Sequence, residues 1–163
     1  MVRFLPFHGT ITSIENFITS PNGEGAGCIK RLTVENQMNG IVNFVVSPAT
    51  YFVDQVQVKV GDRITGYFDG DAPVPLIYPP QYQALIMVKD NPNQNVKVDF
   101  FNTQFVSSDG QLQLNISPDT KIILTNGQPF TANPANRNLI VIYGPATKSI
   151  PAQTTPYKII VLC

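Results

Sequence analysis

The sequence has little charge. Of its 163 residues only 13% are Asp, Glu, Lys or Arg, against about 25% in an average soluble protein. Eleven basic side chains balance eleven acidic ones. Because so few cations cannot neutralise many phosphates, we expect nucleic acid not to be the main partner. Disorder is disfavoured too, because 43% of the residues are hydrophobic and the net charge is zero.

Long apolar runs are missing as well. No run approaches the 18 or more residues of a membrane helix, and residues 1–7 have no apolar core of a signal peptide. We therefore expect no membrane span, and synthesis in the cytosol or a processed mature chain. The spore surface, the extracellular space after release and the cytoplasm stay open as locations.

Cysteine and histidine are scarce. Cys28 and Cys163 are the two cysteines, and their positions fit no zinc or redox spacing. We expect a small buried side chain at Cys28 and a thiol at a strand end at Cys163, and a disulfide stays open. His8 would have to act alone as a catalytic base, and no GxSxG motif accompanies it. We therefore expect a histidine at a strand edge, and no enzyme.

Two further motifs lack the residues that their chemistry needs. Asp69-Gly70-Asp71, with Asp62 nearby, has alternating oxygen ligands but no further acids or closing Glu of a calcium loop. Gly23, Gly25 and Gly27 lack the Lys-Ser/Thr ending of a phosphate loop. We expect a solvated turn and a hairpin tip, with no metal and no cofactor.

An internal repeat is the most informative feature present. Residues 40–50 read GIVNFVVSPAT and residues 110–120 read GQLQLNISPDT, with Gly, Ser, Pro and Thr identical at an offset of 70. Phe68 is then separated from Tyr82 by thirteen residues, and so is Tyr143 from Tyr157, at an offset of 75. Matched blocks in the same order predict duplication of one unit.

The break between the copies falls in DNPNQN, residues 90–95, which has turn chemistry and no apolar residue. This places a first β-barrel-like unit with an N-terminal arm at 1–90. A second, shorter β unit follows at 91–163.

Short runs rich in Val, Ile, Thr and Phe predict an all-β protein, because no twelve-residue window holds an uninterrupted helical stripe. The expected strands are 9–17, 28–34, 41–46, 50–53, 63–68 and 82–88 in the first copy, and 96–102, 111–116, 120–124, 139–143 and 157–162 in the second. After Ser47-Pro48, residues 49–55 form either a short helix or a strand kinked by the proline.

The order of these strands resembles the five-stranded OB barrel, in which a long loop precedes the last strand. We therefore predict two tandem duplicated OB-like units, with small sandwich-like units as the alternative. Because neither copy has much core alone, we expect the two to be packed together.

Three segments carry a resemblance to a group of proteins. They read NFVVSPATYFVD (43–54), PPQYQALIMVK (79–89) and NPANRNLIVIYGPATKSIPAQTTP (133–156). They resemble small uncharacterised proteins of spore-forming Gram-positive bacteria. The resemblance carries no assigned activity and implies a spore or cell-surface setting.

Near-zero net charge and apolar strands predict self-association, because little like-charge repulsion keeps copies apart. Unprotected strand edges pair readily with other molecules, and ALIMV (84–88), LIVIY (139–143) and IIVLC lack such protection. The last run gives the edge candidates Ile159, Ile160, Val161, Leu162 and Cys163.

Residues 1–7 are expected to form an apolar arm that Pro6 separates from the first strand, and its candidate residues are Met1, Val2, Phe4, Leu5 and Phe7. The arm either adds a strand to a neighbouring copy or folds back over its own barrel. We therefore expect a structural, self-assembling subunit of a filament, coat or surface layer, with the protein itself as partner. The contacts would be made by strand edges, the proline-rich loops and possibly the terminal arm.

The alternative function is an OB-type binding module for single-stranded nucleic acid or saccharide. Its ligand face would combine rings for stacking with nearby cations. The candidates are Phe44, Tyr51, Phe52, Tyr67, Phe68, Lys30, Arg31 and Arg63. Against it, residues 1–90 carry a net charge of −2 and residues 91–163 carry +2, and rings at these positions also fit a core.

Overall fold

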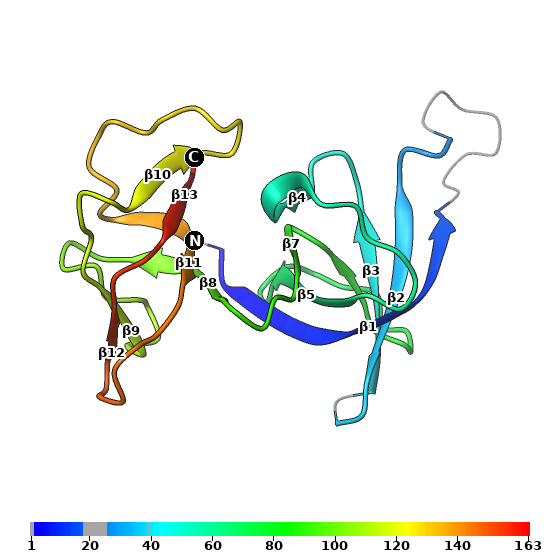
Figure 1. The fold of residues 1–163 in the computed structure, drawn as a ribbon. Helices are drawn as coiled ribbons and strands as arrows, with labels where there is room; N and C mark the ends of the chain where they lie inside the picture. Colours follow the sequence, from blue (N-terminus) through cyan, green and yellow to red (C-terminus); the bar gives the residue numbers. More distant parts are fainter. Residues whose placement is uncertain (1, 18–25, 39) are drawn as a thin grey trace. The chain divides into compact units, whose positions relative to one another are not determined.

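The computed structural model describes residues 2–17, 26–38 and 40–163, and it is all-β (Figure 1). Among these residues the one helical element is η1 (Val53–Gln55), a short 3-10 turn. The chain divides into two compact units, Met1–Asp90 and Asn91–Cys163. The boundary lies inside the apolar-free segment 90–95.

Unit 1 contains seven strands in one sheet. The strands are β1 (Phe4–Asn16), β2 (Lys30–Asn36), β3 (Gly40–Val46), β4 (Tyr51–Phe52), β5 (Arg63–Asp69), β6 (Gln81–Gln83) and β7 (Ile86–Lys89). Their order in the sheet is β4-β7-β5-β1-β2-β3-β6. Side chains alternate between the core and solvent, as Leu32 and Val34 on β2 show by being buried between more exposed neighbours.

The last segment of unit 1 closes the sheet on itself. β6 pairs parallel to β3, and β7 pairs antiparallel to β5. Only Ala84 and Leu85 separate β6 from β7, and their amides donate to the carbonyls of Val45 and Tyr67, at 3.0 and 2.8 Å. Residues 81–89 therefore connect β3 with β5 around one core.

Phe44 lies at the centre of that core. Its ring is fully buried and meets Phe7 edge-on, with the ring centroids 6.4 Å apart. Gly66 on β5 makes room for this ring, because a Cβ atom there would lie 2.6 Å from it. A glycine at this point is thus required by close packing.

Unit 2 repeats the pairing pattern of unit 1. Its strands are β8 (Asn95–Phe101), β9 (Leu112–Leu114), β10 (Lys121–Leu124), β11 (Arg137–Tyr143), β12 (Ala152–Thr154) and β13 (Lys158–Leu162). β11 pairs antiparallel with β8 and β13, as β5 does with β1 and β7. The parallel pairs β9/β12 and β10/β13 correspond to β3/β6 and β4/β7.

Unit 2 differs from unit 1 because its described residues, 91–163, include no continuous strand in the position of β2. In its place stand two isolated antiparallel bridges, Phe101 with Ser107 and Val106 with Gln113. They connect the equivalents of β1 and β3 as β2 does in unit 1. A short bridging segment thus replaces a seven-residue strand.

The repeated Ser-Pro-x-Thr motif forms the same turn in both units. The Thr50 hydroxyl accepts from the Ser47 amide at 3.1 Å and donates to the Ala84 carbonyl at 2.8 Å. In unit 2, the Thr120 hydroxyl accepts from the Ser117 amide at 3.2 Å and donates to the Pro156 carbonyl at 2.9 Å. Each threonine therefore ties its turn to the closing segment.

These bonds also correct one part of the sequence alignment. Leu85 donates to Tyr67, and Tyr157 donates to Ile142, the residue that corresponds to Tyr67. Leu85, rather than Tyr82, is therefore the structural equivalent of Tyr157. The matching of Tyr82 with Tyr157 was wrong by three residues because the loops that precede the two closing segments differ in length.

The helical alternative for residues 49–55 is also wrong. Tyr51 and Phe52 form β4 beside β7, and only the 3-10 turn η1 follows. Asp54 and Gln55 have φ of 61° and 51°, in the left-handed region. A right-handed helix cannot continue through these two residues.

The predicted N-terminal arm is part of the sheet of unit 1 in this structure. Phe4, Leu5 and Phe7 lie on β1 and pair with β5, and Phe7 is buried. Met1 lies outside the described residues, and Val2 precedes the strand. Pro6 does not separate an arm from the strand. It fits within β1 because β2 pairs with β1 only from Thr10 onward, which leaves Pro6 with a single neighbouring strand.

The three apolar runs expected at sheet edges lie inside their sheets. β7 lies between β5 and β4, and β11 lies between β8 and β13. β13 has β11 on one side and β10 on the other, so Ile159, Ile160 and Val161 are fully buried. Leu162 still pairs with Asn138, whereas Cys163 follows the strand and is exposed. Runs that are apolar on both faces are typical of central strands, and this explains why the prediction of sheet edges was wrong.

Candidate interaction surface

The predicted ligand face of aromatic and basic residues does not form. Phe44 and Tyr67 are buried, and Phe52 packs against the same core. Tyr51 is half-buried, and burial raises the pKa of its hydroxyl, with a smaller contribution from Asp54. The interpretation of these rings as core residues is therefore the better one for Phe44 and Tyr67.

The basic members of that set have polar partners of their own or stand apart from the rings. Arg31 bonds to the Glu15 carboxylate at 2.8 Å, and Lys30 donates to the Asn16 side chain at 3.1 Å. The bond from Arg31 lowers the pKa of Glu15. Arg63 is exposed at the start of β5.

Phe68 and Tyr82 are stacked on each other in unit 1. Their ring centroids are 3.9 Å apart and the planes differ by 10°. Both rings pack against Phe44, and both also line a groove with a volume of about 320 Å³. Val2, Val74 and Pro75 form further parts of its wall. The volume is at the low end for small-molecule sites, which span about 300–1,000 Å³.

The loop beside this groove exposes consecutive apolar side chains. We call residues 74–78, which read VPLIY, the apolar loop. Leu76 is fully exposed, Tyr78 is 80% exposed and Ile77 is 54% exposed. Scattered exposed apolar residues are common on soluble proteins, but a contiguous group marks an interaction site.

Prolines restrict the backbone on both sides of these side chains. Pro73 and Pro75 precede Leu76, and Pro79 and Pro80 follow Tyr78. The Tyr78–Pro79 peptide is cis. Because proline fixes φ, less conformational entropy remains to be lost when a partner binds such a loop.

Polar contacts anchor the base of the loop. The Asp69 carboxylate accepts from the amides of Asp71 and Arg3, at 3.0 and 3.2 Å. The Arg3 guanidinium contacts the Asp71 carboxylate at 3.0 Å and donates to the Gly70 carbonyl at 3.1 Å. The two amides lower the pKa of Asp69, and Asp71 raises that of Arg3. These two carboxylates therefore serve a turn, as the sequence predicted.

Asp62 also has a structural role. Its carboxylate accepts from the Lys59 amide at 2.9 Å and lies 3.5 Å from the Lys89 ammonium. The Lys59 amide is the main cause that lowers the pKa of Asp62. Within the described ranges, no group of three or more His, Cys, Asp or Glu side chains could hold a metal ion.

His8 belongs to a hydrogen-bonded chain that joins three parts of unit 1. The buried Thr65 hydroxyl donates to Asp90 Oδ1 at 2.9 Å, so it accepts from His8 Nδ1 at 2.6 Å. His8 lies on β1, Thr65 on β5, and Asp90 follows β7. These hydrogen bonds thus connect the first strand of unit 1 with the residue at its C-terminal boundary.

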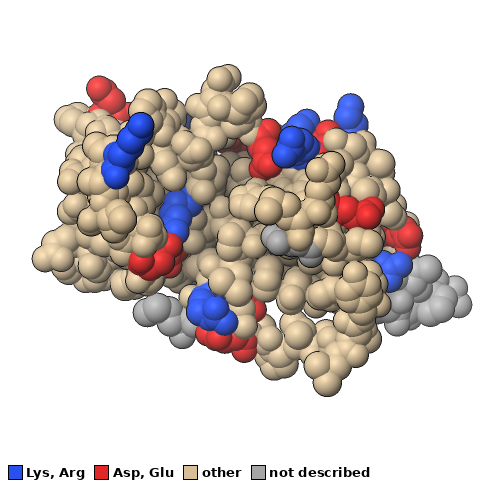
Figure 2. All heavy atoms as spheres, turned by 90° about the horizontal axis from the view of Figure 1, so that it is seen from below, with Lys and Arg blue, Asp and Glu red and all other residues tan. Residues whose placement is uncertain are grey.

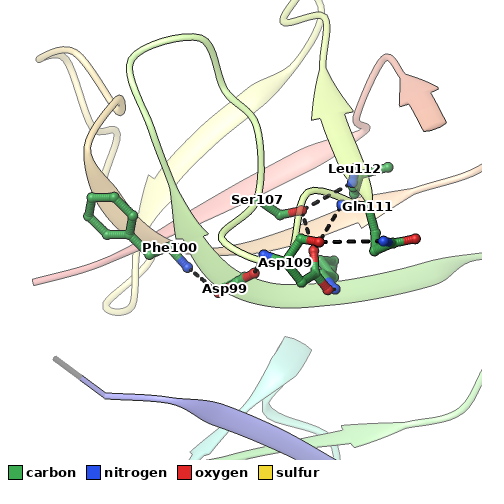
Figure 3. A network of polar contacts seen from close by, with 7 residues as sticks. Asp99, Phe100, Ser107, Asp109, Gln111 and Leu112 are labelled. Atoms are coloured by element: carbon green, nitrogen blue, oxygen red, sulfur yellow. Dashed lines mark hydrogen bonds and ion pairs between the residues drawn. The ribbon is translucent and has the colours of Figure 1, made fainter. Parts of the chain in front are cut away.

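A second polar network replaces the missing strand of unit 2 (Figure 3). The Asp109 carboxylate accepts from the Ser107 hydroxyl at 2.6 Å and from the Gln111 amide at 3.0 Å, and it pairs with Lys97. Burial acts to raise the pKa of Asp109, but the bonds from Lys97, Ser107 and Gln111 outweigh it and lower the pKa. The Ser107 hydroxyl also accepts from the Leu112 amide at 3.0 Å, so it serves this turn.

Two features that the sequence predicts, the glycine-rich segment and Cys28, lie at residues 23–28, which the structure describes only in part. Gly23 and Gly25 lie outside the described residues, and Gly27 has a φ of 83° in a turn. Cys28 is exposed, so the prediction of a buried side chain there was wrong. Cys28 ends the turn and precedes β2, where no core covers it. Both cysteines are free thiols.

The equivalent loop of unit 2 has one large exposed aliphatic residue. Residues 144–151 lead from β11 to β12, as residues 70–80 lead from β5 to β6. Ile150 in this loop is 82% exposed, and Lys148 is exposed beside it. The Ile150–Pro151 peptide is cis. The sequence pointed to the proline-rich loops as contact elements but not to Ile150 or to residues 74–78 as site residues, although Leu, Ile and Tyr between prolines indicate exposed apolar side chains.

The comparisons with known proteins add no relative. The chain matches no protein-family model, and no curated protein matches its sequence. In the part of the chain that the structure describes, no helix has the length and apolar character needed to cross a membrane.

Proposed function

We propose that the protein is a structural subunit that associates with other copies of itself through the apolar loop. The exposure of Leu76, Ile77 and Tyr78 on consecutive positions carries this proposal. These side chains would be removed from water in an assembly, at a gain of about 25 cal/mol for each Å² of apolar surface buried.

We infer that each unit is a variant of the OB barrel. In unit 1, β1, β2 and β3 form an antiparallel meander, and β5 returns beside β1. The closing segment then pairs parallel to β3 and antiparallel to β5. This connectivity supports the proposed OB-like fold of unit 1, and unit 2 shares it with bridges in place of β2.

The sparse charge supports association with the same chain. On the face drawn in Figure 2, most of the surface is uncharged, and acidic and basic side chains lie next to each other at several places. With eleven charges of each sign, little net repulsion opposes contact between copies. The resemblance to proteins of spore formers makes a spore or cell surface the setting to examine first.

The sequence predicts contact through strand edges, loops and the terminal arm, and the positions of these elements favour the loops. The runs at 84–88, 139–143 and 159–163 lie in strands that are flanked on both sides, apart from Cys163. The N-terminal segment is engaged within its own barrel. Loops therefore remain as the better candidates for contact.

Analytical ultracentrifugation with negative-stain microscopy tests the proposal. The wild-type protein should associate as its concentration rises, and a triple variant, L76S/I77S/Y78S, should remain monomeric. Met38→Ser with Val60→Ser is the matched control, because both side chains are exposed and apolar but lie outside the loop. A wild-type protein that stays monomeric, or a triple variant that associates like the wild type, would contradict the proposal.

The binding module is the second candidate, and the stacked pair of Phe68 and Tyr82 at the groove favours it. It is weaker because Asp69 lines the same groove and Phe44 and Tyr67 are buried. Retention on a single-stranded oligonucleotide at low salt, lost at high salt, would support it. A saccharide ligand would show retention that does not depend on salt.

A further inference from the structure

The loop of unit 2 holds its exposed isoleucine in a fixed conformation. The Thr147 amide donates to the Gln153 carbonyl, and the Gln153 amide donates back to the Thr147 hydroxyl, both at 2.9 Å. The Ser149 hydroxyl donates to the Pro151 carbonyl at 2.8 Å. Ile150 stands between these bonded residues and is 82% exposed. A loop backbone held in place in this way loses little entropy when its exposed side chain enters a partner.

The groove of unit 1 suits an aliphatic side chain. The stacked rings of Phe68 and Tyr82 line it, and Val2, Val74 and Pro75 add apolar walls. Its volume of about 320 Å³ suits one or two side chains better than a large ligand. An isoleucine in this space would contact aromatic and aliphatic carbon on several sides.

The charges next to the two features are complementary. Asp69 lines the groove, and Asp71 stands near it with its side chain 61% exposed and Arg3 as its partner. Lys148 lies two residues before Ile150 and is exposed. A lysine brought to this end of the groove could share these carboxylates with Arg3. The net charges of the two units are complementary as well, at −2 for residues 1–90 and +2 for residues 91–163.

We propose that Ile150 of one copy inserts into the groove of the next copy, beside Phe68 and Tyr82, with Lys148 directed toward Asp69 and Asp71. This inference rests on the proposed self-association and names its contact. The inserted residue and the groove belong to different units of the chain, so the contact is heterologous. Repeated head to tail, it gives a ring or an open filament.

Two single variants test the contact because each removes one side of it. Ile150→Asp damages the inserted residue and leaves the groove intact. Val74→Asp places a charge in the groove wall and leaves Ile150 intact. Both positions are exposed, so both variants should fold, and circular dichroism checks this. Asn126→Asp is the control, because it adds the same charge at an exposed turn of unit 2.

Each variant alone should lose association by more than about tenfold in the binding constant. An equimolar mixture of the two variants should form dimers that grow no further, because each dimer contains one intact groove filled by one intact Ile150. The Asn126→Asp control should assemble like the wild type. Analytical ultracentrifugation measures the association of the two variants, of their mixture and of the control.

The outcomes separate this inference from the proposal on which it rests. A wild-type protein that never associates would overturn both. Association of Ile150→Asp at wild-type strength would overturn the insertion alone and leave contact through the apolar loop standing. Two monomeric variants whose mixture also stays monomeric would show that Ile150 and the groove do not bind each other.

Discussion

At the scale of single residues, the two threonines of the repeated turn contribute most clearly to the fold. Thr50 and Thr120 are both buried, and each accepts one hydrogen bond and donates another. The carbonyls that receive their protons, those of Ala84 and Pro156, belong to the segments that close the two units. The threonine hydroxyl thus links a local turn to a long-range contact.

Thr50→Val should lower the free energy of unfolding by about 1–3 kcal/mol. Valine has nearly the shape of threonine, so the main loss is the pair of hydrogen bonds, which leaves the Ala84 carbonyl without this donor inside the protein. Urea unfolding measures the change. Thr12→Val is the control, because Thr12 is exposed and bonds Thr33 at 3.3 Å, and it should stay within about 0.5 kcal/mol. Equal effects of the two substitutions would show that the buried hydrogen bonds of Thr50 stabilise the fold no more than the exposed bond of Thr12 does.

The sequence allowed the repeated motif to be found but not its partners. Ser, Pro and Thr recur at a fixed offset because the turn itself needs them. The groups that the threonines bind are backbone carbonyls, which any residue can supply, so Ala84 and Pro156 share no sequence signal. The exposed Ile150 was missed for a related reason, because exposure depends on the loop's conformation and not on the residue type.

At the scale of elements, the positions of the strands in the sequence were predicted well, but the order of the strands in the sheets was not. Nearly all the short β-branched runs are strands, and the all-β class follows from them. Which strand lies beside which depends on long-range pairing that periodicity does not report. The runs 139–143 and 159–163 are apolar on both faces, which indicated central strands, yet they were interpreted as edges.

The first half of β1 allows a direct test at this scale. Deletion of residues 1–7 should destabilise unit 1 strongly, because it removes the pairing of Phe4, Leu5 and Phe7 with β5 and the buried Phe7 ring. Loss of a buried Phe side chain alone costs about 3–5 kcal/mol, a large part of the usual 5–15 kcal/mol of a domain. Thermal unfolding followed by circular dichroism measures it. An unchanged transition would mean that the segment is a detachable arm after all.

At the scale of the whole molecule, each of the two units has a hydrophobic core of its own. One core contains Phe44 with residues of unit 1, and the other contains Phe101 with residues of unit 2. Within the described residues, neither cluster includes a side chain from the other unit. Each unit can therefore keep its shape while its loops change in sequence, which is what the loops 70–80 and 144–151 show.

Residues 1–90 and 91–163, produced as separate fragments, should each fold. Each has its own closing segment, its own threonine-anchored turn and its own buried cluster, so no strand pairing is lost at the cut between Asp90 and Asn91. The fragment 91–163 should unfold at the lower urea concentration, because it is smaller and has bridges in place of β2. Urea titrations followed by circular dichroism should give one cooperative transition for each fragment. A fragment with sheet content only in the presence of the other would show instead that each core depends on its neighbour.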